Sequence, residues 1–293
     1  CKASDSIAML NMYDTLVFPN SDGTTGAFVA DKWEVSEDSK EYTFHLRDDV
    51  IFHSGNKLTA SDVKYSMDRL LDIGEGFAYI FSDVVESCQV IDDKTVQFIL
   101  KDPSGTFISM LTRLYILDEK TVQEHTNSSG SYGENGDYGK EWLLTNDAGS
   151  GPYKVREMRT EEYLIVERYS DYWGGWEENA PESIKMLGGL DGTAIRTMIS
   201  RGELDITDDS QTYEAYEAMD AMDGVDIAQY LSGVNFNLML NTKAAPTDDI
   251  HVRRAMAFAT DYDSIVNDIF IGSKRATGPV VLGMTAAALT EED

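Results

Sequence analysis

The feature of this sequence that most constrains its fold is a change of hydrophobic period between residues 42 and 71. Residues 42 to 46 alternate between apolar and polar side chains, which is the period of a half-buried β-strand. From residue 63 onwards the apolar side chains recur at helical spacing instead. A strand followed so closely by an amphipathic helix predicts a core built from both kinds of element.

Capping residues mark the start of that helix. Thr59 is expected as the N-cap, and Asp62 lies three residues later in the capping-box position. Leu58 and Val63 have the spacing of a hydrophobic staple. A cap of this kind stabilises a helix by about 1 kcal/mol. Because these local signals agree, a helix that begins after Thr59 is predicted.

Alternating runs predict three hairpins in the first part of the chain. After the strand at residues 42 to 46, Val50 to Phe52 is expected to return as its partner strand. Residues 89 to 100 and 153 to 168 each contain two alternating runs around a polar turn. Residues 126 to 140 are rich in Ser, Gly, Asn and Tyr and predict a surface loop.

The second part of the chain mixes predicted helices and short strands. The expected elements are a helix at 193 to 201 that stops at Gly202, strands at Leu204 to Ile206 and Val234 to Leu240, and helices at 249 to 260 and 261 to 270. Strands and helices do not alternate strictly, and no internal repeat is present. This pattern favours an α/β fold with mixed sheets and α+β character, and argues against a barrel or a sandwich.

Charge and composition exclude several classes of protein. The 293 residues include 52 acidic and 24 basic side chains, for a net charge of −28. A surface this negative repels phosphate backbones, so no nucleic-acid partner is expected. No stretch approaches the roughly 18 to 20 apolar residues of a membrane span. Cys1 and Cys88 are too few for a disulfide framework or a cysteine zinc site, and Cys88 is expected to be a buried thiol.

Signatures of catalysis and of cofactor binding are missing from the sequence. The four histidines have no metal-ligand spacing, and neither a nucleophile elbow nor a phosphate loop occurs. Gly74-Glu75-Gly76 resembles the start of a dinucleotide fingerprint, but Tyr79 stands where the third glycine would fall. Neither a catalytic residue, nor a metal, nor a cofactor is therefore predicted. Large aromatic side chains near turns are either structural anchors or the lining of a ligand pocket: Trp33, Trp142, Tyr153, Tyr169, Tyr172, Trp173 and Trp176.

Four ordered segments carry a resemblance to a known family. The segment from Trp33 to Leu71 reads WEVSEDSKEYTFHLRDDVIFHSGNKLTASDVKYSMDRLL and closely resembles the signature of solute-binding protein family 5. These are the extracellular oligopeptide-, dipeptide- and nickel-binding proteins of ABC importers. The other matching segments follow in the family's order: residues 149 to 153 with 167 to 173, residues 201 to 206, and residues 249 to 261.

This resemblance implies a two-lobed clamshell of the periplasmic-binding-protein type, with an incomplete second lobe. Residues 1 to 13 and 119 to 231 are expected in the first lobe. Residues 14 to 118 would form the family's extra domain, and residues 232 to 293 the start of the second lobe. The sequence therefore looks like an internal fragment, with any anchor or signal peptide outside it.

The same resemblance suggests which residues contact a ligand. Tyr79 aligns with a ligand-contacting tyrosine, and Phe77 is added because it lies close by. Ser4, Asp5 and Ser6 match an extended edge segment that pairs with a peptide backbone, and Asp5 matches an acidic residue there. Ser232, Val234 and Asn235 are expected where the chain crosses to the second lobe.

The implied function is binding without catalysis, as the part of an ABC importer that captures short peptides by hinge closure. The expected partners are a short peptide and the permease subunits, with the protein a monomer at the outer face of a bacterial cell membrane or in the periplasm. Alternatives are a nickel chelate, haem or an oligosaccharide as ligand, a sensor that signals to a membrane receptor, and, from another class, a secreted hydrolase.

Overall fold

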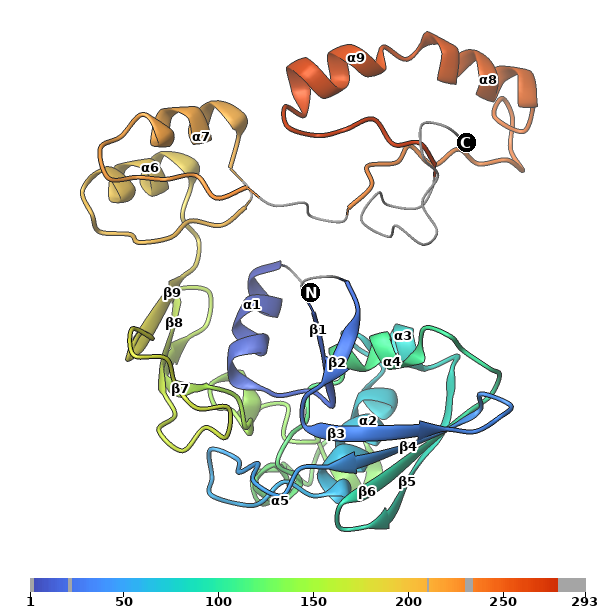
Figure 1. Ribbon diagram of the computed structural model, residues 1–293, viewed down its shortest axis with the longest axis vertical. Coiled ribbons are helices and arrows are strands. Elements are labelled where there is room, and N and C mark those ends of the chain that lie inside the picture. The colour runs from blue at the N-terminus through green and yellow to red at the C-terminus, as the bar shows by residue number, and fades with distance from the viewer. Residues whose placement is uncertain (1–2, 21–22, 210, 230–233, 279–293) are drawn as a thin grey trace. The chain divides into compact units, whose positions relative to one another are not determined.

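The computed structural model describes residues 3–20, 23–209, 211–229 and 234–278 (Figure 1). The chain divides into two compact units, Cys1–Gly189 and Leu190–Asp293. The first unit contains three antiparallel sheets, and the described part of the second contains helices and irregular chain. The mixed α/β character expected from the sequence is confirmed.

Among the described residues, the largest sheet of the first unit is antiparallel and four-stranded. Its strands, in spatial order, are β3 (Ala30–Val35), β4 (Glu41–Leu46), β6 (Thr95–Leu100) and β5 (Val85–Asp92). The alternation in β4 is confirmed, because Tyr42, Phe44 and Leu46 are buried while the residues between them are half-buried. Helix α2 (Ala60–Ile73) packs against β5 and β6 and covers one face of this sheet.

The expected partner strand at Val50 to Phe52 is absent. Strand β4 pairs with β3 and β6 instead, and Ile51 makes only an isolated bridge to Lys57. Val50 and Phe52 are fully buried. Their apolar side chains are therefore explained by burial in the core. The positions beside β4 in the sheet are occupied by β3 and β6.

The predicted cap of α2 is confirmed. Thr59 and Asp62 form a capping box, in which the Asp62 carboxylate accepts from the Thr59 backbone N–H at 2.8 Å. Leu58 and Val63 are both fully buried, as the staple requires. The helix ends at Gly74, whose φ of 70° is left-handed and suits glycine.

The two other predicted hairpins are also present. Strands β5 and β6 form one, and β7 (Tyr153–Arg159) with β8 (Tyr163–Arg168) forms the other. Strand β9 (Ser183–Leu187) extends the second pair to three strands, and β1 (Val17–Pro19) pairs with β2 (Thr25–Ala27).

Short helices connect these sheets. They are α1 (Ala3–Met12), α3 (Ala78–Phe81), α4 (Phe107–Met110), η1 (Leu111–Arg113), α5 (Glu119–Glu124), η2 (Gly133–Asn135) and η3 (Trp142–Leu144). The segment at 126 to 140, expected to be a surface loop, consists mainly of turns and η2. It also buries Tyr138, which packs in a small core with Tyr65 and Val122.

Two larger clusters form the main cores of the first unit. The buried members of the largest lie between Leu16 and Ile116 and come from the four-stranded sheet, α2 and the segments beside them. The second cluster joins the end of α1 to the three-stranded sheet through Met12, Tyr13 and Val166.

In its described residues, the second unit is helical. Its elements are α6 (Gly192–Ser200), α7 (Tyr213–Asp220), α8 (Ile250–Ala259), α9 (Tyr262–Ser264) and the π-helical turn η4 (Ile265–Ile269). The predicted helices are present, but the expected strands at 204 to 206 and 234 to 240 are not. A strand needs a hydrogen-bonded neighbour, and the described part of this unit contains none.

Candidate ligand-binding surface

Helix α3 displays Tyr79 on the surface of the first unit. The turn between α2 and α3 contains Gly74 and Gly76, both with left-handed φ. Two buried side chains, Ala78 and Phe81, hold α3 on the core. Tyr79 lies between them in sequence, yet 74% of it is exposed. Tyr79 is therefore accessible to a partner molecule on a firmly packed helix.

Phe77, just before α3, belongs to a cluster of aromatic rings. Its ring centroid lies 6.5 Å from that of Tyr115, which in turn lies 6.3 Å from that of Tyr13. The guanidinium carbon of Arg113 lies 5.3 Å from the Phe77 ring centroid. We call Tyr13, Phe77, Arg113 and Tyr115 the aromatic cluster. It brings together the end of α1, the start of α3 and the end of η1.

Electrostatics within this cluster favour neutral, protonated hydroxyls. Burial raises the pKa of Tyr13 well above its usual value. Burial also raises the pKa of Tyr115, although the neighbouring Arg113 opposes that shift. Both tyrosines are therefore hydrogen-bond donors at neutral pH.

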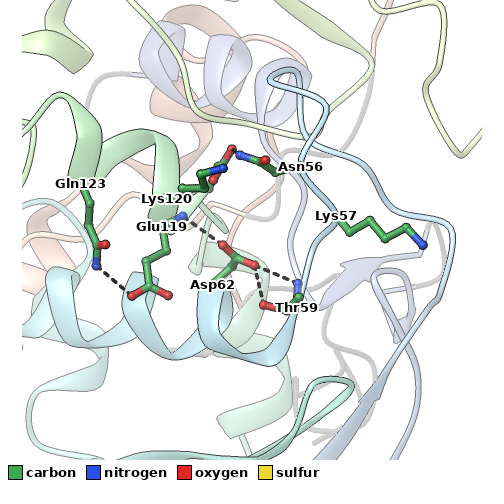
Figure 2. Close-up of a pocket in the computed structure, with 8 residues that line it drawn as sticks. Asn56, Lys57, Thr59, Asp62, Glu119, Lys120 and Gln123 are labelled. Atoms are coloured by element: carbon green, nitrogen blue, oxygen red, sulfur yellow. Dashed lines mark hydrogen bonds between the residues drawn. The ribbon is translucent and has the colours of Figure 1, made fainter.

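A polar depression of about 410 Å³ lies between α2 and α5 (Figure 2). Within it, the Asp62 carboxylate accepts from the backbone N–H of Thr59 and of Glu119, at 2.8 and 2.9 Å. Asp118 accepts from Asn56 Nδ2 at 2.9 Å, and also caps α5. Because these carboxylates are already occupied by the protein's own donors, the depression is a structural joint between the two helices and a poor ligand site.

A buried polar junction lies where the chain leaves α1. Trp173 Nε1 and Ser150 Oγ donate to the same Asp14 oxygen, at 2.8 and 2.9 Å. Burial raises the pKa of Asp14 to about 6, and these two hydrogen bonds oppose that shift. Beside it, His53 pairs with the buried carboxylate of Asp147. We call Asp14, His53, Asp147, Ser150 and Trp173 the buried junction.

Two glycines allow the backbone to pass closely at this junction. Gly151 donates its N–H to the Met12 carbonyl oxygen at 3.0 Å. A Cβ at Gly151 would lie 2.6 Å from the Met12 carbonyl carbon, and one at Gly149 would overlap the Met12 carbonyl oxygen. Glycine is therefore required at both positions by the approach of the segment that follows α1.

The structure places the other sequence-predicted site residues apart from this cluster or leaves them outside its description. Ser4, Asp5 and Ser6 lie in the first turns of α1, so the expectation of an extended segment is wrong. Their backbone follows a helix, which cannot offer a strand edge. Ser232 lies outside the described residues.

Val234 and Asn235 belong to the second unit, in irregular chain. Val234 is 75% exposed, and Asn235 Nδ2 donates to the Gly278 carbonyl oxygen at 3.4 Å. Of the predicted residues, the structure thus brings Phe77 into a cluster and places Tyr79 on the adjoining helix.

Arg113 and Tyr115 were not predicted from the sequence. A signal for them exists in residues 113 to 116, where polar and apolar side chains alternate. Leu114 and Ile116 are buried, whereas Arg113 is exposed and Tyr115 is half-buried. An extended segment with one face in the core turns the two intervening side chains to its other face. Their approach to Phe77 depends on tertiary packing and has no local sequence signal.

The described residues contain no group of three or more His, Cys, Asp or Glu side chains that could hold a metal ion. Within the same ranges, every helix is too short or too polar to cross a membrane.

Comparison with known proteins identifies the family of this chain. The family model for bacterial extracellular solute-binding proteins, family 5, middle, matches residues 26–293. The probable D,D-dipeptide-binding periplasmic protein of Escherichia coli is 31% identical over 280 residues, which cover 93% of this chain and 52% of that protein. The chain spans about half the length of the curated relatives it matches.

Solved structures show the same fold. The NikZ protein of Campylobacter jejuni, in complex with Ni(L-His), matches with a TM-score of 0.72 and 21% identity, over 88% of this chain and 50% of that one. A dipeptide-binding protein of Pseudoalteromonas, in complex with Met-Leu, matches with a TM-score of 0.70 and 21% identity, over 89% of this chain and 53% of that one. The family model, the curated relative and the shared fold together place the chain among the bacterial extracellular solute-binding proteins of family 5.

Proposed function

We propose that this chain is part of the substrate-binding component of an ABC importer and captures short peptides for delivery to a membrane permease. The observation that carries the proposal is the 31% identity with a probable dipeptide-binding protein over 93% of the chain. Capture proceeds by closure of two lobes around the ligand, and the buried ligand stabilises the closed state. The protein binds and releases its ligand without converting it.

The proposed lobes follow the family's organisation. Residues 1 to 13 and 119 to 231 form the first lobe, residues 14 to 118 the extra domain, and residues 232 to 293 the start of the second lobe. The separation of the cores supports this division, because the buried members of the largest cluster lie between Leu16 and Ile116. The second cluster draws on Met12 and Tyr13 with residues after 150.

We assign Tyr79 and Phe77 to the ligand-contacting surface of the first lobe. Exposure of Tyr79 on a packed helix supports that role, as does the close approach of Phe77 to Tyr115 and Arg113. Ser4, Asp5 and Ser6 and the hinge-crossing Ser232, Val234 and Asn235 remain proposals from the resemblance.

The proposed setting is the periplasm or the outer face of a bacterial membrane, because curated relatives are periplasmic proteins. The net charge of −28 opposes self-association of the chain. It also disfavours binding to large anionic partners such as nucleic acids. The protein acts as a monomer and binds the permease transiently.

Calorimetry on the full-length protein tests this proposal. Met-Leu, the Ni–L-His complex and haem are titrated in turn. Binding of a peptide at one site per protein, with no binding of haem or of the nickel complex, supports peptide capture. Tight binding of the nickel complex or haem alone would replace the peptide with that ligand. Continuous heat from turnover of a peptide would contradict the proposal that the protein binds its ligand without converting it.

A further inference from the structure

The segment at 126 to 140 contains the only Asn-Gly step in the sequence, at Asn135–Gly136. Asparagine deamidates most readily before glycine, because glycine has no side chain to hinder the attack of its backbone nitrogen on the asparagine side chain. We propose that Asn135 is a deamidation site of this protein, and that its conversion to aspartate unfastens this segment from α2.

The reaction needs only the chain and water. The backbone nitrogen of Gly136 attacks Cγ of Asn135, and a C–N bond forms. The side-chain nitrogen of Asn135 leaves as ammonia with the proton of the Gly136 amide. Water then opens the cyclic imide at either carbonyl, which gives aspartate or isoaspartate at this position. No electron is transferred, and each product carries one more negative charge than Asn135.

In the folded chain, both reacting groups are engaged in hydrogen bonds. The Gly136 N–H donates to the Gly133 carbonyl oxygen at 3.1 Å, and Asn135 Nδ2 donates to the Tyr138 hydroxyl at 2.7 Å. Gly136 is also closely packed, since a Cβ there would lie 2.3 Å from the Asn127 carbonyl oxygen. Attack requires the Asn135 side chain to leave Tyr138 and the turn to rearrange, so the native fold slows deamidation.

Tyr138 connects Asn135 to α2. Its hydroxyl accepts from Asn135 and donates to Asp72 Oδ2 at 2.5 Å. Burial and the hydrogen bond with Asp72 raise the pKa of Tyr138, so the hydroxyl keeps its proton at neutral pH. Because Asp72 belongs to α2, this chain of hydrogen bonds fastens the segment to that helix.

Deamidation removes the donor from this chain of hydrogen bonds. A carboxylate at position 135 can only accept, and the single hydroxyl proton of Tyr138 is already donated to Asp72. Two like charges then face one hydroxyl and repel each other. Tyr138 also has a left-handed φ of 55°, which is strained for a bulky side chain. Because the hydroxyl contacts hold this conformation, their loss favours opening of the segment.

Two further contacts hold the segment, so the expected opening is local. Arg69 Nε donates to the Tyr138 carbonyl oxygen at 2.9 Å, and Lys140 pairs with Glu75 at 2.9 Å. Neither contact involves the Asn135 side chain, so both survive deamidation. We therefore expect faster hydrogen exchange at 126 to 140 while the rest of the first unit stays folded.

Peptide mapping by mass spectrometry of incubated full-length protein tests whether Tyr138 slows the reaction. Asn135 should deamidate about tenfold more slowly than in an unstructured peptide of residues 130 to 141, because attack must await local opening. Tyr138→Phe keeps the ring and removes the hydroxyl, and should speed deamidation about fivefold through loss of one hydrogen bond. Asn127, in the same segment, is the internal reference. Equal rates in protein and peptide, or equal acceleration at both asparagines, would overturn protection by Tyr138.

Asn135→Asp reproduces the product, and hydrogen exchange of the full-length variant measures its effect. Exchange of backbone amides at 126 to 140 should rise about fivefold. Asn127→Asp is the matched control, because it makes the same change of charge in the same segment. Asn127 Oδ1 accepts from the Ser129 N–H at 3.0 Å, and a carboxylate keeps that hydrogen bond. This control should exchange as wild type does.

The double variant Asn135→Asp/Asp72→Asn completes the test. It reverses the chain of hydrogen bonds, because Tyr138 can then donate to the carboxylate at position 135 and accept from the amide at position 72. Exchange at 126 to 140 should return to the wild-type rate. Failure of this rescue would overturn the unfastening, as would wild-type exchange in Asn135→Asp or an equal rise in Asn127→Asp.

Discussion

Asp14 illustrates how a single buried carboxyl couples stability to pH. It lies 1% exposed and is held by donors from two distant segments, at Ser150 and Trp173. Burial outweighs these hydrogen bonds and raises its pKa to about 6. The folded protein therefore binds this proton more tightly than the unfolded chain does, so the ionised form of Asp14 opposes folding.

The first prediction concerns Asp14→Asn. Because the folded pKa is raised from 3.8 to about 6, wild type gains stability from Asp14 as pH falls from 7 through 6 towards 4, and loses it as pH rises through the same window. Relative to Asp14→Asn, wild type should gain about 1 kcal/mol between pH 7 and pH 5. Urea unfolding at both pH values measures the difference. A gap that stays constant would show that Asp14 does not titrate in this window.

Tyr79→Ala is the second prediction at this scale. The side chain is 74% exposed, so its removal leaves no cavity and should shift the melting temperature by less than about 1 °C. Loss of an aromatic contact should weaken ligand binding about tenfold, since aromatic side chains dominate contact energies. Paired calorimetry and thermal melts check both. A large fall in melting temperature together with the affinity would make Tyr79 a packing residue.

At the scale of elements, the predictable parts of the fold are those with local determinants. The capping box of α2 and the turns of the β5–β6 and β7–β8 hairpins each depend on a few neighbouring residues. Val50 to Phe52 has the apolar character of a strand, yet its place beside β4 is taken by β3 and β6. In a run this short, a buried irregular segment and a paired strand have the same apolar sequence pattern.

Residues of the candidate site also differ in whether the local sequence indicates them. Tyr79 and Phe77 are proposed from their place after the capped helix, within the resemblance. Ser4 to Ser6 were expected in an extended segment and lie in α1. That expectation came from the resemblance and had no support in the local sequence. Arg113 and Tyr115 reach Phe77 only through tertiary packing, which local sequence does not encode.

The third prediction tests the joint between α2 and α5. Asp62 is buried and accepts from the backbones of Thr59 and Glu119, so its removal leaves donors of both helices unpaired. Asp62→Ala should destabilise the protein by about 2 kcal/mol and Thr59→Ala by about 1 kcal/mol. Urea unfolding measures both changes.

Asp68→Ala is the control for this pair. Asp68 lies on the same helix and pairs with Lys64 at the surface, where an ion pair contributes less than about 1 kcal/mol. Equal losses for Asp62→Ala and Asp68→Ala would show that the joint has no special role.

At the scale of the whole molecule, the dominant feature is a net charge of −28 on 293 residues. Repulsion among like charges opposes the compact state, and salt screens it over about 10 Å at 0.1 M. The excess of acidic side chains is spread along the chain, so no single ion pair offsets the repulsion. It also discourages contact with anionic surfaces while leaving small ligands free to enter.

The fourth prediction follows from that charge. Raising NaCl from 20 to 300 mM should increase the melting temperature by several degrees, because screening relieves repulsion in the folded state. Differential scanning calorimetry at neutral pH measures the effect, with sucrose of equal osmolality as the control for non-ionic stabilisation. A melting temperature that falls with salt would mean that attractive ion pairs outweigh the repulsion.

The central claim is that a protein containing this chain holds a small ligand and returns it unchanged. Equilibrium dialysis of the full-length protein against Met-Leu, followed by mass spectrometry of the ligand recovered after denaturation, tests it directly. We expect one intact dipeptide bound per protein and complete recovery of the supplied mass. Recovery of free Met and Leu would contradict it, as would the failure of any peptide or chelate to remain with the protein.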